Sequence, residues 1–325
     1  MKKFMKRCAI LAFIFAVLGC VLGMVGSTIA GRSSISQMLE DISGGRIHAG
    51  EGWRNWHMEM GSDFLEDIGD ALDDVDYDIQ DASTFDREFE VMTGNVERYC
   101  PGQNIRNLEV EVGGCQLETK ISEDDSIYLE AEHAHKFQGY VSGDTLYVRA
   151  TTGSVKDFAE VSKRRIILYV PQDYFFEQVK IEVGAGELSF ADLHAESANL
   201  EVGAGRIVLD GVQAQDLELS VGAGSIELFD MSIAKLEAEV GLGEFRAEGS
   251  IESEADVQCS MGNVEMTLDD REEAFNYHLE GSMGNISLGS ESYSGFSSER
   301  KIDNHADKEM EIECSMGNIS IDFRK

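Results

Sequence analysis

The sequence predicts an all-β protein built as a β-solenoid, in which two-strand repeats of about 19 residues stack behind one N-terminal transmembrane helix. Three observations support this fold class: a glycine tetrapeptide at a fixed interval, hydrophobic columns on both sides of it, and an uncharged run near the N-terminus. A fixed period of about 20 residues is typical of repeat architectures, whose units stack on their neighbours.

The recurring tetrapeptide is VGAG at Val183, Val202 and Val221, VGLG at Val240 and CSMG at Cys259. These five copies are equally spaced along the chain, and two later copies, which end at Gly284 and Gly317, follow at longer intervals. We expect all of them to form structural turns between strands. The predicted turn glycines are Gly184, Gly186, Gly203, Gly205, Gly222, Gly224, Gly241, Gly243, Gly262, Gly284 and Gly317.

Hydrophobic residues flank every copy in fixed columns, which predicts one strand on each side of the glycines. Leu200 and Val202 precede a copy at even positions, whereas Ile207 and Leu209 follow it at odd positions. Alternate residues of a strand face opposite sides, so both pairs can face one core only if the chain bends between them. We expect the glycines to supply this corner through positive φ and close backbone approach, with rungs roughly 4.8 Å apart.

The N-terminus has the pattern of a membrane anchor. Residues 1–7 include four basic residues, and the uncharged residues 8–31 are long enough to span a bilayer core of roughly 30 Å. We expect residues 1–7 in the cytoplasm and the chain after residue 31 outside the cell, which makes the membrane one partner. Two alternatives remain: a lipobox that ends at Cys20, and a signal peptide cut after Ala30.

Two regions follow the anchor. Residues 32–95 form an acidic spacer with some apolar residues at helical spacing, which we expect to be partly helical or disordered. Residues 96–325 are predicted as the β-repeat domain. Its early part includes Val112-Gly113-Gly114-Cys115, which looks like a copy of the tetrapeptide with Cys115 at the second glycine position.

Cys259 and Cys314 stand in the same column, and the copy that contains Gly281 lies between them in the sequence. If the copies stack in chain order, the two cysteines are two rungs, or roughly 10 Å, apart. A disulfide requires Cα atoms within roughly 7 Å, so we expect no bond between them.

Charge and motif content exclude several function classes. The 61 acidic and 27 basic residues give a formal net charge of -34, which excludes a nucleic-acid partner. GAG lacks the third glycine of a dinucleotide loop and precedes a strand, so no cofactor is expected. His133 and His135 have no further metal ligand nearby, and solvent-facing acids such as Glu201 and Glu239 are too general to single out a catalytic pair. We expect no catalytic or metal site.

The tetrapeptide copies, the repeated SMGN and the terminal GNISIDF, behind a short basic-flanked anchor, resemble bacterial surface proteins of the DUF4097 family, described as putative adhesins. The resemblance covers roughly residues 105–325. It implies a non-enzymatic envelope protein with a β-solenoid and a role in adhesion or envelope stress, and it supplies no catalytic residues. The departures are the spacer at 32–95, Cys115, and the insertion between Gly289 and Lys308.

Three functions are weighed. The leading hypothesis is a membrane-anchored extracellular scaffold that binds an unknown surface protein or glycan along its faces. The first alternative is a β-helix enzyme acting on polysaccharides, which needs a carboxylate pair in a groove. The second is a polymerising cytoskeletal solenoid of the cytoplasm, against which the anchor argues.

Overall fold

The computed structural model describes residues 85–86, 88–151, 164–294 and 298–324, all of which belong to the unit Asp76–Lys325. The all-β class is confirmed there: 18 strands form one coiled sheet, and the helical content is a 3-10 turn at Glu272–Ala274. The membrane helix expected at residues 8–31 lies outside the described residues. Within the described ranges, no helix has the length and apolar character of a membrane span.

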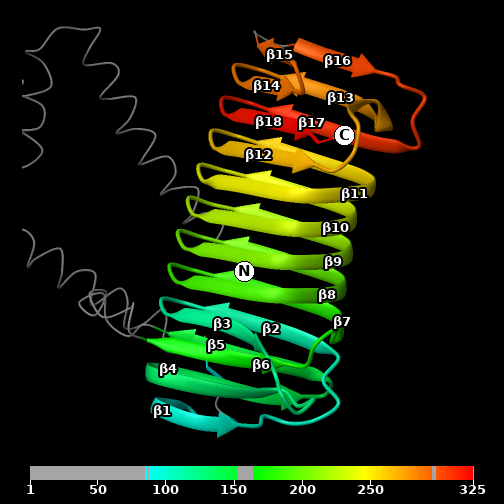
Figure 1. Ribbon diagram of the computed structural model, residues 1–325. Coiled ribbons are helices and arrows are strands. Elements are labelled where there is room, and N and C mark those ends of the chain that lie inside the picture. Colours follow the sequence, from blue (N-terminus) through cyan, green and yellow to red (C-terminus); the bar gives the residue numbers. More distant parts are fainter. Residues whose placement is uncertain (1–84, 87, 152–163, 295–297, 325) are drawn as a thin grey trace, which may run out of the picture. The chain divides into compact units, whose positions relative to one another are not determined.

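Five strands make the regular centre of the stack (Figure 1). Leu188 pairs with Ile207, and Ile207 pairs with Ile226, so neighbouring strands run parallel and each column repeats at the period of the tetrapeptide. This is the solenoid that the glycine period predicts. The strands are β7 (Phe175–Val183), β8 (Glu187–Val202), β9 (Arg206–Val221), β10 (Ser225–Val240) and β11 (Glu244–Cys259).

Each coil turns more often than the sequence predicts. The four strands β8 to β11 have 16 residues each and run unbroken from one glycine corner to the next. Within β8 the buried residues switch from even to odd positions and back, so the strand bends twice: they are Leu188 and Phe190, then Leu193 and Ala195, then Ala198, Leu200 and Val202. A coil therefore has three short faces instead of the two expected.

The strands that precede the centre extend the stack at one end. β2 and β3 pair in parallel with β7 and β8 on one side and with β5 and β6 on the other. β4 then pairs antiparallel with β5 and β6, and β1 pairs antiparallel with β4 through an irregular register. The strands are β1 (Met92–Tyr99), β2 (Asn107–Val112), β3 (Gln116–Ile121), β4 (Tyr128–Ser142), β5 (Thr145–Thr151) and β6 (Arg165–Val170). Strand β1 begins ahead of the boundary expected at residue 96.

The last strands do not stack in chain order. β17 pairs with β11 and β13, and β18 pairs with β12 and β14, so the C-terminal rung lies inside the stack. The intervening β15 and β16 pair antiparallel with β14 and β13 and cover the outer side of the rung that β13 and β14 form. The strands are β12 (Asn263–Leu268), β13 (Phe275–Gly281), β14 (Asn285–Leu288), β15 (Glu291–Ser294), β16 (Ser298–Ile302), β17 (Lys308–Cys314) and β18 (Asn318–Phe323).

This strand order corrects the expectation for the cysteines. Cys259 and Cys314 are directly registered partners on neighbouring strands, not residues two rungs apart. Parallel neighbours are roughly 4.8 Å apart, which is within the Cα separation of a disulfide, so distance gives no reason against a bond. The expected two-rung separation was wrong because it assumed that the copies stack in chain order. Both cysteines are nevertheless free thiols in the structure.

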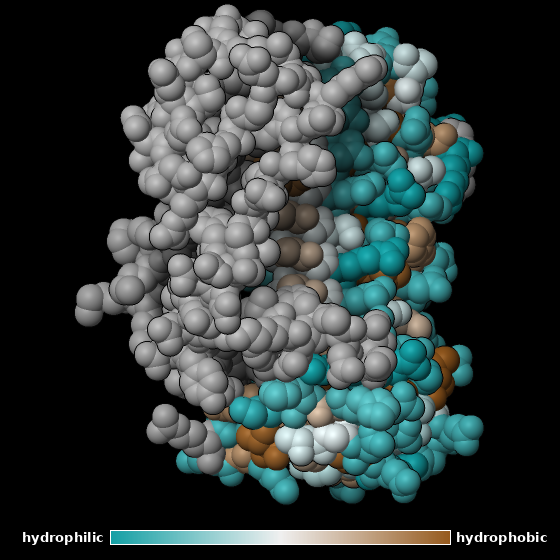
Figure 2. Space-filling view, turned by 90° about the vertical axis from the view of Figure 1, so that its left-hand side faces the viewer, coloured by the Kyte–Doolittle hydropathy of each residue, from teal (hydrophilic) through white to brown (hydrophobic). Residues whose placement is uncertain are grey.

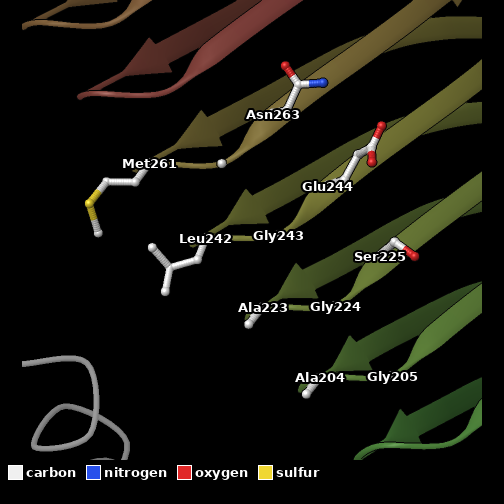
Figure 3. Close-up of a pocket in the computed structure, with 11 residues that line it drawn as sticks. Ala204, Gly205, Ala223, Gly224, Ser225, Leu242, Gly243, Glu244, Met261 and Asn263 are labelled. Atoms are coloured by element: carbon white, nitrogen blue, oxygen red, sulfur yellow. The ribbon is translucent and has the colours of Figure 1, made fainter. Parts of the chain in front are cut away.

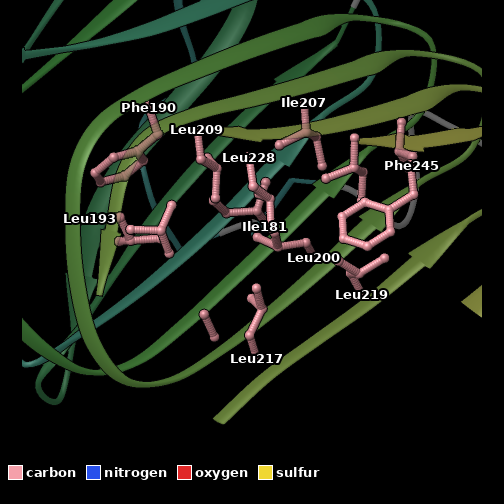
Figure 4. Packing of buried hydrophobic residues seen from close by; sticks show 14 of the residues in the cluster. Ile181, Phe190, Leu193, Leu200, Ile207, Leu209, Leu217, Leu219, Leu228 and Phe245 are labelled. Carbon is pink, nitrogen blue, oxygen red and sulfur yellow. The ribbon is translucent and has the colours of Figure 1, made fainter. Parts of the chain in front are cut away.

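One continuous hydrophobic core fills the coils. Phe190, Leu209 and Leu228 lie in one column on successive coils, and each is at most 1% exposed. Figure 4 shows these side chains directed into the coil together with Ile181 and Leu200. Each large side chain buried in this way contributes about 1.5–3 kcal/mol relative to an exposed one. Because the columns run from coil to coil, this packing holds each coil against the coils on either side of it.

The inverted strand order can be tested with paired cysteines. Glu265 is the registered partner of Ser320 on β18, whereas Ser287 on β14 is one rung further away. We expect oxidation to crosslink the variant Glu265→Cys/Ser320→Cys, whose Cα atoms are about 4.8 Å apart, and not Glu265→Cys/Ser287→Cys, at about 10 Å. A non-reducing peptide map reads out both, and stacking in chain order requires the opposite result.

Candidate interaction surface at the glycine corner

The glycine corners form one edge of the stack, and their backbone belongs to the parallel ladder. In a typical corner, Gly222 N–H donates to Val202 O at 2.8 Å and Ala223 N–H donates to Gly203 O at 2.7 Å. Ser225 N–H then donates to Gly205 O at 3.0 Å. All the predicted turn glycines lie in these short bends between strands. The corner thus recurs in every coil without interrupting the hydrogen bonds between rungs.

The second glycine of each corner lies against the rung before it. A Cβ built on Gly243 would be 2.1 Å from Gly224 O and 2.7 Å from Val221 Cγ1. The corresponding distance to the carbonyl oxygen is 2.2 Å at Gly224 and 2.3 Å at Gly205. Such distances leave no room for a side chain, so we infer that close backbone approach requires glycine here.

Positive φ does not explain these residues, although we expected it from the sequence. The described glycines with positive φ are Gly94, Gly143, Gly211, Gly249 and Gly289, none of which belongs to the tetrapeptides. The corner instead uses φ values open to other residues, and the first glycine is less crowded: Cβ on Gly241 would be 3.0 Å from Gly222 O. Serine accordingly replaces the first glycine at Ser260, Ser282 and Ser315.

A second corner, which we did not expect from the sequence, does use positive φ. Asp192, Gly211, Asp230 and Gly249 have φ of 60°, 77°, 50° and 144°, and they recur at the same interval as the tetrapeptide. Aspartate tolerates the left-handed region better than most residues, and glycine adopts it freely. The signal was present in the sequence as alternating Asp and Gly at that interval.

The middle residues of the glycine corners point away from the stack and form a column, here called the corner stripe. Backbone hydrogen bonds between successive rungs fix its order as Ala204, Ala223, Leu242, Met261, Met316 and Met283. Leu242 is 40%, Met316 49% and Met283 58% exposed, and these are three of the six large hydrophobic residues exposed in the described part of the chain. Figure 2 faces this edge and shows brown hydrophobic atoms in a column beside a hydrophilic face.

A shallow groove of about 630 Å³ runs along the first four residues of the stripe (Figure 3). Ala204 and Ala223 leave it open, whereas Leu242 and Met261 extend further from the backbone. Among the residues that line the groove, Glu244 is the one carboxylate. The groove is therefore glycine-rich, with apolar side chains along one side and no pair of acids.

Asparagines run beside the methionine end of the stripe. Asn318 Nδ2 donates to Asn263 Oδ1 at 3.1 Å, and Asn285 Nδ2 donates to Asn318 Oδ1 at 3.0 Å. This ladder fixes the three side chains on neighbouring rungs and keeps charge away from that flank. The repeated SMGN of the sequence is thus one three-rung surface of methionine and asparagine.

The cysteine pair lies behind the same corner, facing the core. A hydrogen bond from Cys259, with further ones from the backbone of Gly317 and Asn285, lowers the pKa of the Cys314 thiol to about 7. The same hydrogen bond raises the pKa of Cys259, which keeps the shared proton. Both thiols are buried, so the pair belongs to the packing of the corner and not to its surface.

Two clusters of potential metal ligands lie elsewhere in the described residues. Asp173, Asp192 and His194 form one, and His278, Glu280 and Glu299 form the other, with ligand atoms within 4.8 Å of one another. His194 Nε2 is 2.8 Å from Asp192 Oδ1. His278 is 3.3 Å from each of three carboxylates, those of Glu280, Glu299 and Glu311, as in ordinary surface ion pairs. His133 and His135 belong to neither cluster.

The two glycine positions predict different costs of substitution. Gly243→Ala places a Cβ against a backbone oxygen that cannot move without breaking the ladder, so we expect it to destabilise by about 3 kcal/mol. Gly241→Ala in the same corner is the matched control, with an expected cost of about 1 kcal/mol or less. Urea unfolding of both variants measures this difference, and equal midpoints would contradict the close-approach argument.

The second corner predicts a different pair of outcomes. A Cβ on Gly211 meets nothing closer than 3.5 Å, whereas one on Gly249 would be 2.1 Å from Met231 O. Since asparagine accepts positive φ, we expect Gly211→Asn to change stability by less than about 1 kcal/mol and Gly249→Asn to cost about 3 kcal/mol or more. Thermal unfolding separates the two, and a severe loss for Gly211→Asn would show that open space and φ do not govern this corner.

Comparison with known proteins places the fold. The family model described as Toastrack DUF4097 matches residues 105–221 and 192–322, together well over half of the chain. No relative is found among curated proteins.

Solved structures of low identity are also similar. A putative adhesin from Bacteroides fragilis has 13% identity and a TM-score of 0.39, covering 71% of this chain and 97% of its own. A putative cell adhesion protein from Clostridium sporogenes has 10% identity and a TM-score of 0.31, covering 72% and 98%. A putative lipid binding protein from Parabacteroides distasonis has 14% identity and a TM-score of 0.36, covering 73% and 97%. On the family match, the chain belongs to the Toastrack DUF4097 family.

Proposed function

We propose that the chain is a non-enzymatic binding scaffold of the cell surface, an adhesin-like protein that residues 8–31 anchor in the membrane. The observation that carries the binding role is the corner stripe, which gathers half of the exposed large hydrophobic residues of the described chain on one edge. The basic residues 1–7 and the uncharged run after them support the anchor and its orientation.

Exposing a column of apolar side chains to water is unfavourable, and a scaffold without a partner would gain nothing from it. Contiguous apolar surface rimmed by polar residues is a common mark of an interaction site, and methionine adapts its shape to a partner. The middle position of the corner does not require a large side chain, since alanine occupies it at Ala204 and Ala223. Leucine and methionine on the following rungs therefore favour a role outside the fold.

The enzyme alternative lacks its chemical requirement at this groove. Hydrolysis of a glycosidic bond uses two carboxyl groups on opposite sides of the bond, roughly 5–10 Å apart. The groove presents Glu244 alone. Acids elsewhere on the described faces, such as Glu227 beside Arg206, take part in exposed ion pairs along the strands. A binding role needs none of this chemistry.

The polymer alternative conflicts with the ends of the stack. Growth of a solenoid filament requires an open parallel strand at each end, but β1 and the β15 and β16 strands close the two ends with antiparallel pairing. β1 has register shifts throughout, and β15 and β16 are 4 and 5 residues long. Irregular and short edge strands are the usual means of preventing edge-to-edge association.

The binding role is tested by screening the full chain, in phosphatidylcholine nanodiscs, against arrays of glycans and cell-surface proteins. We expect retention of at least one ligand that the variant Leu242→Ser/Met316→Ser/Met283→Ser retains about tenfold less. The matched control is Val91→Ser/Ile121→Ser/Phe175→Ser, which removes the other three exposed hydrophobic residues and should leave binding unchanged. If no ligand is retained, or if both variants lose it equally, the proposal is wrong.

A further inference from the structure

We propose that the corner stripe binds a cationic amphipathic α-helix of a partner protein, with the apolar face of the helix laid along the rungs. This rests on the proposed binding function and names the chemistry of its partner. Its basis is the spacing of the apolar side chains, the charge of the surface beside them, and the adaptability of the methionines.

The apolar residues are continuous only because of the inverted strand order. Met316 N–H donates to Ser260 O at 2.7 Å, and Met283 N–H donates to Ser315 O at 2.7 Å, so Met261, Met316 and Met283 occupy three consecutive rungs. With Leu242 they make an unbroken row of four large side chains. From Ala223 to Met283 the row extends roughly 19 Å, at about 4.8 Å for each rung.

This spacing matches an α-helix that lies parallel to the row. A helix presents a side chain on one face every turn of about 5.4 Å, close to the rung spacing of about 4.8 Å. Over four steps the difference is only about 2 Å, which methionine side chains with three rotatable bonds can absorb. About 13 helical residues would cover the row.

The charge of the surroundings decides which helix fits. The outward column next to the stripe consists of the residue before each tetrapeptide. Along the stripe it carries four exposed glutamates and two neutral residues, in the order Glu201, Ser220, Glu239, Gln258, Glu313 and Glu280. Glu239 and Glu313 form no salt bridge within the described part of the chain. The whole protein carries a net charge of -34, so an acidic helix or an anionic lipid surface is repelled. Lysines or arginines beside the apolar face of the helix would meet this column.

The opposite flank suits the polar side of such a helix. Asn263, Asn318 and Asn285 are held in a neutral hydrogen-bonded ladder there. The site is therefore asymmetric, with an apolar row between an acidic column and an amide ladder. A groove-bound amphipathic helix uses the same arrangement of apolar anchors at helical spacing with charges at the side.

The test measures binding of a labelled 16-residue peptide, with leucines at helical spacing and lysines elsewhere, to the full chain in phosphatidylcholine nanodiscs. Fluorescence anisotropy gives the affinity, and empty nanodiscs give the binding to lipid. We expect the amphipathic peptide to bind at least tenfold more tightly than a scrambled peptide of the same composition, and than the analogue with glutamates. Leu242→Ser/Met316→Ser/Met283→Ser should weaken binding about tenfold, and Val91→Ser/Ile121→Ser/Phe175→Ser should leave it unchanged.

The acidic column has its own variant. Glu239→Gln/Glu313→Gln should weaken binding several-fold at low salt and reduce its dependence on salt, because exposed charges are screened. Equal binding of the amphipathic and scrambled peptides, or equal binding by the stripe variant and its control, would overturn the proposal. So would self-association of the unmodified chain that the stripe variant abolishes, or binding of the peptide to empty nanodiscs that is as tight as its binding to the chain.

The two proposals fail in different ways. If the stripe variant still loses a ligand from the glycan and protein arrays while the leucine-lysine peptide does not bind, the scaffold function stands and the cationic helix is wrong. If neither the arrays nor the peptide depend on the stripe, both proposals are wrong.

Discussion

Close contact between the second glycine of each corner and the backbone before it is the constraint on which the stack depends. The carbonyl oxygen of one glycine occupies the position that a Cβ of the next would take, at 2.1–2.3 Å in three successive corners. A side chain here would push the rungs apart and break the hydrogen bonds that the corner makes to the previous coil. Since the central coils meet their neighbours in this way, the repeat length and the register are fixed together there, and the hydrophobic columns follow.

Because all the coils share this pattern, the pattern does not determine the order in which they stack. The strands near the C-terminus determine it. All copies present the same columns, so β13 and β17 are both suitable neighbours for β11. The segment that becomes β15 and β16 pairs antiparallel with β14 and β13, which occupies one side of that rung and leaves the other side for the C-terminal strands. The antiparallel strands cannot continue a parallel stack, so the same step that inserts the last rung also closes the end.

These two facts explain how much the sequence predicts. The glycine period identified the solenoid, the corner residues and the core columns, because each depends on local spacing. Aspartate and glycine at positions 192, 211, 230 and 249 could have predicted the second corner from the same period, but alternation between two residue types hides the repeat. The neighbour of Cys259 could not be predicted, because the copies ending at Gly284 and Gly317 are equivalent by pattern. The prediction of positive φ at the tetrapeptides was wrong. Glycine can be required either for positive φ or for close backbone approach, and at these corners the reason is close backbone approach.

The corner also separates structural demands from functional ones within a few residues. The second glycine cannot be replaced, because a Cβ would clash with the backbone of the previous rung. The first position accepts glycine or serine. The middle residue points to solvent and is limited by neither, so folding does not dictate its identity. Along the stack it changes from alanine to leucine and then to methionine, while the residue after the second glycine changes from charged or small to asparagine. A surface feature that becomes larger and more neutral over consecutive rungs, in a protein of net charge -34, supports the proposal of a binding edge. Because the strand inversion brings Met316 between Met261 and Met283, the fold itself assembles that edge from parts of the chain that are distant in sequence.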